Sequence, residues 1–224
     1  MKRIFISLFV AAVMLPALAQ QLQVEKRVNN LLTFPEFRKA KVLQSFNRSV
    51  EADANIYLGK STLVYKDSNQ IKEAVNASIV GVQFDDSTKY VVINYANRQV
   101  AKVVSQRNYN FLLCVTTVDM DKYNEETRGG TNLPFFEIDG GGFSELQPVI
   151  LETDGDKWED SKGYPLKDQY FFSVKGTIVP ANETAIKPYI SPDFKEAFKN
   201  KMADRWWSWK NPENLKDILL FLPQ

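Results

Sequence analysis

Short runs of β-branched and aromatic residues, separated by turn residues, fill the chain from residue 38 to residue 119. The runs are Lys41–Phe46, Asn55–Leu58, Thr62–Lys66, Ser78–Phe84, Tyr90–Tyr95, Val100–Ser105 and Phe111–Val118. Residues that favour turns lie between them, such as Asn47-Arg48, Gly59-Lys60 and Asp85–Ser87. Because turns this close together leave no room for long crossovers, neighbouring strands should pair antiparallel. The pattern therefore predicts a β meander over residues 38–119.

The pattern changes after the meander. Residues 120–148 lack a strand or helix period and contain Gly129-Gly130 and Gly140–Gly142, which predicts a long loop. Strand character returns at Val149–Glu152, at Gln169–Val174 and at Thr177–Val179. We therefore expect further strands within residues 149–180.

The apolar spacing becomes helical over residues 191–222. Ser191 is an N-cap candidate, and Pro192 suits the first position of a helix. Asn211-Pro212 repeats this start signal. The apolar residues that recur at helical spacing are Phe194, Ala197, Phe198 and Met202, followed by Leu215, Ile218, Leu219 and Leu222. The chain thus predicts a single α+β domain over residues 20–224. We expect an antiparallel β meander, curled into a small sandwich or open barrel, with two short C-terminal helices packed on it.

The N-terminus has the three regions of a secretion signal. Lys2 and Arg3 precede the apolar stretch Ile4–Leu15, and Ala17–Ala19 matches a small-residue cleavage site. This predicts a signal peptide over residues 1–19, cleavage near Ala19, and export to the periplasm or the exterior. The alternative is a hydrophobic first helix of the folded domain. The sequence has no stretch of about 20 apolar residues, so no transmembrane anchor is expected.

Composition excludes several classes of chemistry. The chain has 28 basic and 27 acidic residues, which gives no electrostatic case for binding nucleic acid. It has no histidine, which excludes Ser-His-Asp and Cys-His catalysis and every metal site built on histidine. Its one cysteine, Cys114, cannot form an internal disulfide. We expect neither a metal nor a cofactor, and we expect Cys114 to be a buried, inert thiol that shares a strand face with Leu112 and Thr116.

Carboxylates are the remaining catalytic material. Glycoside hydrolases need two of them, about 5–10 Å apart. The candidates are Asp119 with Asp121, Glu137 with Asp139, and the group Asp154, Asp156, Glu159 and Asp160. Spacing alone is not specific, and solvated loop acids explain all of these residues better.

The aromatic candidates for ligand binding are Trp206, Trp207 and Trp209. If the helix that starts at Pro192 continued this far, Trp209 would join its apolar stripe and Trp206 would lie at the margin of that stripe. Trp207 would then point away from the core. An exposed indole can stack on a sugar ring or anchor a partner surface. Trp207 is therefore the leading candidate of the three.

A set of short motifs is distributed over the predicted domain: Asn55, Tyr57-Leu58, Ser61, Leu63–Tyr65, Tyr90–Ile93 and the ending Phe194–Leu222. In these pieces the chain resembles a family of exported bacterial β-meander proteins of unknown function. The resemblance covers most of the predicted domain, but its motifs are structural. It implies the fold and export, and it supplies no assigned activity and no catalytic residues.

Together these features favour a non-catalytic role over an enzyme. The first expectation is an exported binding or interaction module of the cell envelope, whose ligand is a glycan, a lipid or a protein. A carboxylate-dependent glycan hydrolase is the second expectation, and it would need two acids across a cleft. A structural or assembly factor of the envelope is the third, and it would need only an apolar patch or an unpaired strand edge.

Overall fold

A computed structural model of the chain describes residues 25–68, 70–126 and 163–224. The signal peptide expected over residues 1–19 and the strand expected at Val149–Glu152 lie outside the described residues. The carboxylates Glu137, Asp139, Asp154, Asp156, Glu159 and Asp160 lie outside them too. No helix in the described ranges is both long enough and apolar enough to cross a membrane.

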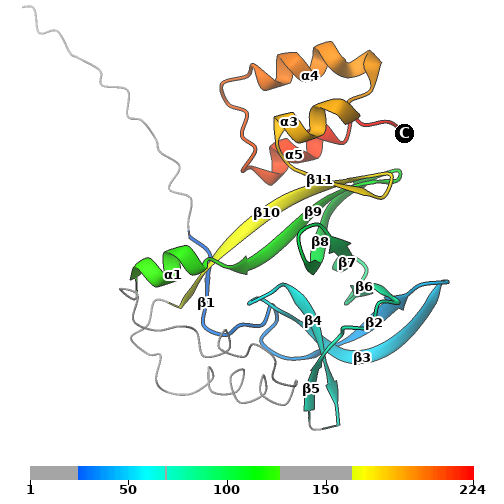
Figure 1. Ribbon diagram of the computed structural model, residues 1–224, viewed down its shortest axis with the longest axis vertical. Helices are drawn as coiled ribbons and strands as arrows, with labels where there is room; N and C mark the ends of the chain where they lie inside the picture. Colours follow the sequence, from blue (N-terminus) through cyan, green and yellow to red (C-terminus); the bar gives the residue numbers. More distant parts are fainter. Residues whose placement is uncertain (1–24, 69, 127–162) are drawn as a thin grey trace, which may run out of the picture.

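Antiparallel pairing joins the described strands into one open sheet (Figure 1). The strands are β1 (Arg27–Val28), β2 (Arg38–Gln44), β3 (Arg48–Tyr57), β4 (Thr62–Asp67), β5 (Gln70–Glu73), β6 (Ile79–Gln83), β7 (Lys89–Asn94), β8 (Arg98–Arg107), β9 (Asn110–Val118), β10 (Tyr164–Val174) and β11 (Thr177–Pro180). Their order is β1-β10-β9-β8-β7-β6-β2-β3-β4-β5, and β11 also pairs with β10. The predicted antiparallel α+β class is confirmed, and the sheet remains unclosed.

One connection departs from a simple meander. After β5 the chain returns to pair β6 with β2, so β2–β5 and β6–β10 form two consecutive runs joined at the β2–β6 ladder. The sheet also curls back on itself. The backbone N–H of Val100 in β8 donates to the carbonyl of Ser61 in the β3–β4 turn, and Val118 of β9 donates to Leu58. These bonds bring the end of β3 over β8 and β9.

Several strands are longer than the apolar pattern predicts. β3 starts at Arg48 rather than Asn55, because its first half is a hairpin arm whose residues are largely exposed. β10 starts at Tyr164, and β5 was not predicted, since Gln70–Glu73 is too short and polar to show a period. The pairing of Gln44 with Arg48 leaves residues 45–47 as the β2–β3 turn, in which Phe46 and Asn47 have φ values of 60° and 57°, in the left-handed region that tight hairpin turns use.

Short helices lie at two places along the sheet. Met120–Glu126 forms the helix α1, which lies near β1 and the start of β10. The expectation of a loop over residues 120–148 is therefore wrong for its first residues, 120–126. α3 (Glu183–Ile186), α4 (Lys195–Met202) and α5 (Pro212–Ile218) cover one face of β9–β11 (Figure 1). Single 3₁₀ turns occupy Lys187–Tyr189 and Pro192–Phe194. The two predicted C-terminal helices are confirmed as α4 and α5, and Asn211 caps α5 by accepting from the N–H of Glu213.

The strands β9 and β10 are buried on both faces. On one face Leu112 and Phe172 pack against Ile186, Phe198 and Leu215 of the helical layer. On the other face Leu113, Val115 and Phe171 pack against Ile93 and Ala101. Burial on both faces explains why these strands are nearly continuous apolar runs in the sequence.

Candidate functional site

Four residues form a row across four neighbouring strands. Strand register places Tyr90 opposite Lys102, Lys102 opposite Cys114, and Cys114 opposite Tyr170. Residues that face each other across antiparallel strands project from the same side of the sheet, about 5 Å apart. The phenol, ammonium, thiol and phenol of these residues therefore stand side by side. We call this set the donor row.

A second polar pair lies next to the donor row. Thr116 and Asp168 face each other across β9 and β10. The hydroxyl of Thr116 donates to Oδ1 of Asp168 at 2.6 Å, and the ammonium of Lys26 pairs with Oδ2. The side chain of Asp168 is 14% exposed, whereas that of Lys26 is 65% exposed. Both oxygens of this largely buried carboxylate are thus engaged.

These polar groups line a cavity of about 500 Å³, which we call the first cavity. Its apolar walls are Val28, Ile56, Leu58, Val103, Val104 and Leu166. The cavity lies inside the curl of the sheet, because it is lined by Ile56 of β3 and by Leu58 directly after β3, in the segment that folds over β8 and β9. A cavity of this volume with a few grouped polar side chains has the size and lining of a small-molecule site.

A second cavity of about 720 Å³ adjoins the first. The two share the lining residues Lys26, Leu166, Asp168, Tyr170 and Pro212. Trp209 and Lys210, from the segment between α4 and α5, complete the second cavity on the helical side. The two cavities therefore lie side by side, and residues of the helical side line the second one more extensively than the first.

Burial raises the pKa of the two phenols and the thiol in the donor row. It raises the pKa of Tyr90 to about 12 and that of Cys114 to about 11, and Asp168 contributes to the rise at Cys114. Burial also raises the pKa of Tyr170, with further contributions from Cys114 and Asp168. A neutral thiol is a poor nucleophile. At neutral pH both phenols and the thiol can donate a hydrogen bond, as can the ammonium of Lys102, and the phenol oxygens can also accept one.

The thiol prediction is confirmed in structure. Cys114 is buried, at 8% exposure, and lies on the same face of β9 as Leu112 and Thr116. Its sulfur lies 3.8 Å from the hydroxyl of Thr116. The sequence pattern did not indicate that this face also borders a cavity.

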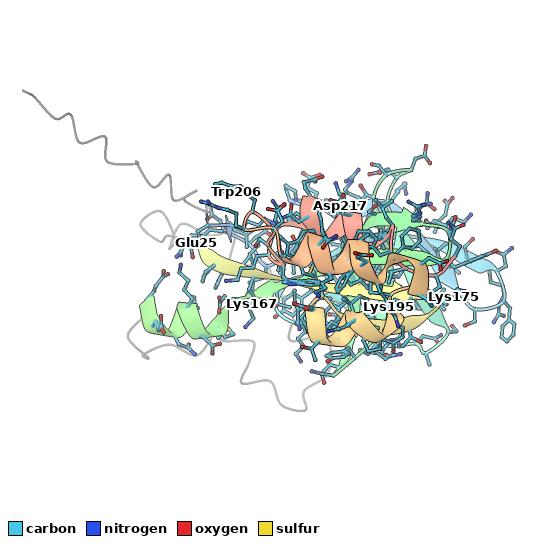
Figure 2. All side chains as sticks on the ribbon, turned by 90° about the horizontal axis from the view of Figure 1, so that it is seen from above. Glu25, Lys167, Lys175, Lys195, Trp206 and Asp217 are labelled. Carbon is cyan, nitrogen blue, oxygen red and sulfur yellow. The ribbon has the colours of Figure 1, made fainter. Side chains whose placement is uncertain are left out.

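The predicted orientation of the tryptophans is wrong. α4 ends at Met202, and Asp204 then forms a turn by accepting from the N–H of Trp206, so the helical extrapolation fails. Trp206 is 77% exposed, and the guanidinium of Arg205 lies 4.8 Å from its ring centroid. Figure 2 shows Trp206 at the margin of the helical layer.

The other two tryptophans pack inward. Trp207 contacts the helical core, and its indole Nε1 is buried with no hydrogen-bond partner among the described residues. Trp209 meets Trp207 edge to face, with ring centroids 5.7 Å apart, and lines the second cavity. Of the three ligand-binding candidates, the structure thus places Trp209 at a cavity and Trp206 on the surface. Their role in binding stays a prediction.

The described carboxylate candidates form a surface ion-pair group. The ammonium of Lys167 lies 3.9 Å from Asp119 and 4.0 Å from Asp121. The side chain of Asp121 is 93% exposed, and Asp119 starts α1 by accepting from the N–H of Tyr123. Within residues 25–68, 70–126 and 163–224, no group of three or more Cys, Asp or Glu residues is placed to hold a metal ion.

Most of the residues that line the first cavity carry no distinctive pattern in the sequence. Tyr90, Lys102, Asp168 and Tyr170 lie on different strands, and only the strand register brings them together. A partial signal existed in β9, where Cys114 and Thr116 interrupt the apolar face that runs from Leu112 to Val118. No protein-family model, curated protein or solved structure matches this chain.

Proposed function

We propose that this chain is an exported, non-catalytic binding module of the cell envelope that holds a small organic ligand in the first cavity. The observation that carries the proposal is the donor row, which stands in a cavity with apolar walls. Such a site can hold a ligand by hydrogen bonds and apolar contact. The support for export is the signal pattern of the first 19 residues.

The protonation of the site favours binding over turnover. The thiol of Cys114, whose pKa is about 11, stays neutral at pH 7 and so does not supply a thiolate nucleophile. No imidazole exists in the chain to act as a base. The described acid pair, Asp119 and Asp121, shares a lysine at the surface, whereas a glycosidase needs a general acid in an apolar setting. These features support a binding module over the hydrolase alternative.

A glycan is the ligand class that the tryptophans favour. Trp209 lines the second cavity, and the exposed indole of Trp206 offers a flat apolar face beside it along the chain. A glycan on Trp206 and Trp209 would contact the second cavity and the surface beside it. Tyr90, Lys102 and Cys114 of the donor row line only the first cavity. An assembly factor of the envelope would need neither cavity.

Filling the cavity tests the proposal. The probe is N-phenyl-1-naphthylamine, a neutral fluorescent compound that brightens in apolar sites. Val28 lies on the short edge strand β1 and lines the first cavity, so Val28→Trp should fill it. We expect this variant to weaken probe binding at least tenfold. Leu166→Trp, placed on β10, fills the cavity from a second side.

The matched control is Val80→Trp, because Val80 is 46% exposed on β6 and lies outside the lining of the cavity. It should bind the probe as the unmodified protein does. Melting temperature and far-ultraviolet circular dichroism report whether each variant folds. Probe affinity that survives in folded forms of both filling variants would overturn the proposal.

A further inference from the structure

We infer that the first cavity takes an organic anion, in which a carboxylate is joined to an apolar body, with the carboxylate on the donor row. The inference rests on the proposed binding function and names its ligand class. The strand register places the Tyr90 and Tyr170 phenols, the Cys114 thiol and the Lys102 ammonium side by side, and at neutral pH each of them can donate a hydrogen bond. A carboxylate accepts hydrogen bonds and donates none, so it is the complementary group.

The charged side chains that line the cavity also favour an anionic ligand. Lys26 and Lys102 line it, and Asp168 is the only acidic side chain that the lining contains within the described residues. Lys26 already pairs with Asp168, and the second oxygen of Asp168 accepts from Thr116. Lys102 makes no ion pair within the described ranges. The positive charge left for a ligand is therefore that of Lys102, in the middle of the donor row.

The same arrangement disfavours a cation. A cationic ligand would have to displace Lys26 from Asp168 and would meet the ammonium of Lys102. An anion would have no such repulsion to overcome, and its pairing with the exposed Lys102 would be a charge-assisted hydrogen bond.

Apolar residues near the end of β3 offer contacts for the rest of the ligand. Ile56, in β3, and Leu58, directly after it, line the cavity together with Val28 and Leu166, and Leu166 also lines the second cavity. Ile56 is 1% exposed and Leu58 is 3% exposed, so this lining is part of the core rather than a flexible surface. An apolar lining that contains one ammonium without an ion pair among the described residues suits an amphiphilic anion.

Three probes of equal chain length separate charge from apolar contact. Decanoate, decan-1-ol and decyltrimethylammonium are titrated at pH 8 against the protein loaded with N-phenyl-1-naphthylamine, at concentrations where none forms micelles. We expect decanoate to displace the probe at a concentration at least tenfold below that of the alcohol, and the cation to be the weakest. A further titration with 1-naphthoate tests whether a rigid aromatic carboxylate binds more tightly than the flexible chain of decanoate.

Lys102→Met tests the residue that the inference names. The variant keeps an unbranched side chain and removes the ammonium, so decanoate should bind about tenfold or more weakly, since a hydrogen bond to a charged group is lost. Decan-1-ol should bind as before. Lys41→Met is the matched control, because Lys41 is an exposed strand lysine outside the cavity lining. It should change neither affinity.

The outcomes separate the two proposals. If decan-1-ol binds as tightly as decanoate, or if Lys102→Met leaves decanoate binding unchanged, the anion inference is overturned and the cavity function stands. If decanoate displaces the probe equally well from folded Val28→Trp and Leu166→Trp, the cavity is not the site and both proposals fall.

Discussion

The two ends of the β9–β10 ladder use the same face in different ways. At one end Leu112 faces Phe172, and both side chains are fully buried beneath α3, α4 and α5. At the other end Cys114 faces Tyr170 and Thr116 faces Asp168, and these polar pairs border the first cavity. On this face the side chains change from apolar to polar between the Leu112–Phe172 pair and the Cys114–Tyr170 pair.

This difference separates stability from recognition along a single ladder. The covered end excludes water and is filled by apolar side chains, so it contributes hydrophobic stabilisation. The cavity end contains unfilled volume, which weakens packing. Its polar groups are partly exposed, so they can donate hydrogen bonds to a ligand. Substitutions at the two ends should therefore have different readouts, and the following predictions rest on that separation.

The largest expected effect is at the covered end. Phe172 is fully buried, so Phe172→Ala should lower the free energy of unfolding by about 3–5 kcal/mol through lost apolar contact and a residual cavity. Thr116→Ala, at the cavity end, should cost about 1 kcal/mol, because it removes one hydrogen bond to Asp168. Urea denaturation followed by circular dichroism measures both. Equal losses from the two variants would contradict the separation of roles.

A pH effect of intermediate size should come from the cavity end. Burial raises the pKa of the Cys114 thiol to about 11, whereas an unfolded thiol titrates at about 8.5. Between these values the unfolded chain binds fewer protons than the folded one, so stability falls as pH rises. The loss by pH 11 should be on the order of 3 kcal/mol. Tyr90, whose pKa is raised to about 12, acts with the same sign at higher pH.

Cys114→Ser isolates this effect. A serine hydroxyl does not titrate in this range, so the decline between pH 9 and pH 11 should be shallower than in the unmodified protein. Denaturation curves at a series of pH values measure the slope. Thiol modification gives a second readout, because the folded protein should react slowly below pH 9 and rapidly once unfolded in urea. Parallel pH profiles for the two proteins would show that Cys114 does not carry the shift.

The sequence predicts the covered end better than the cavity end. The apolar pattern predicts most of the strands, because burial leaves a local imprint on residue type. Of the two helix start signals, Pro212 is the first residue of α5, whereas Pro192 begins the 3₁₀ turn directly before α4, which starts at Lys195. The donor row depends on register across four strands and on the sheet curling over β8, for which no local pattern exists. The tryptophan prediction failed for a related reason, since it extended a local helix past its end at Met202.

The smallest expected effect lies where the helical cover ends. Trp206 is 77% exposed and contacts Arg205 beside it in the chain, so Trp206→Ala should change the free energy of unfolding by no more than about 0.5 kcal/mol. Trp207→Ala should cost at least about 1 kcal/mol, because this indole packs on the helical core and meets Trp209. Chemical denaturation of the two variants measures this contrast directly. Titration with a panel of oligosaccharides then asks whether tryptophan fluorescence changes in the unmodified protein and ceases to change in Trp206→Ala. Such a loss, in a variant of unchanged stability, would place a glycan on the outer surface, whereas an unaltered response would limit recognition to the inner site.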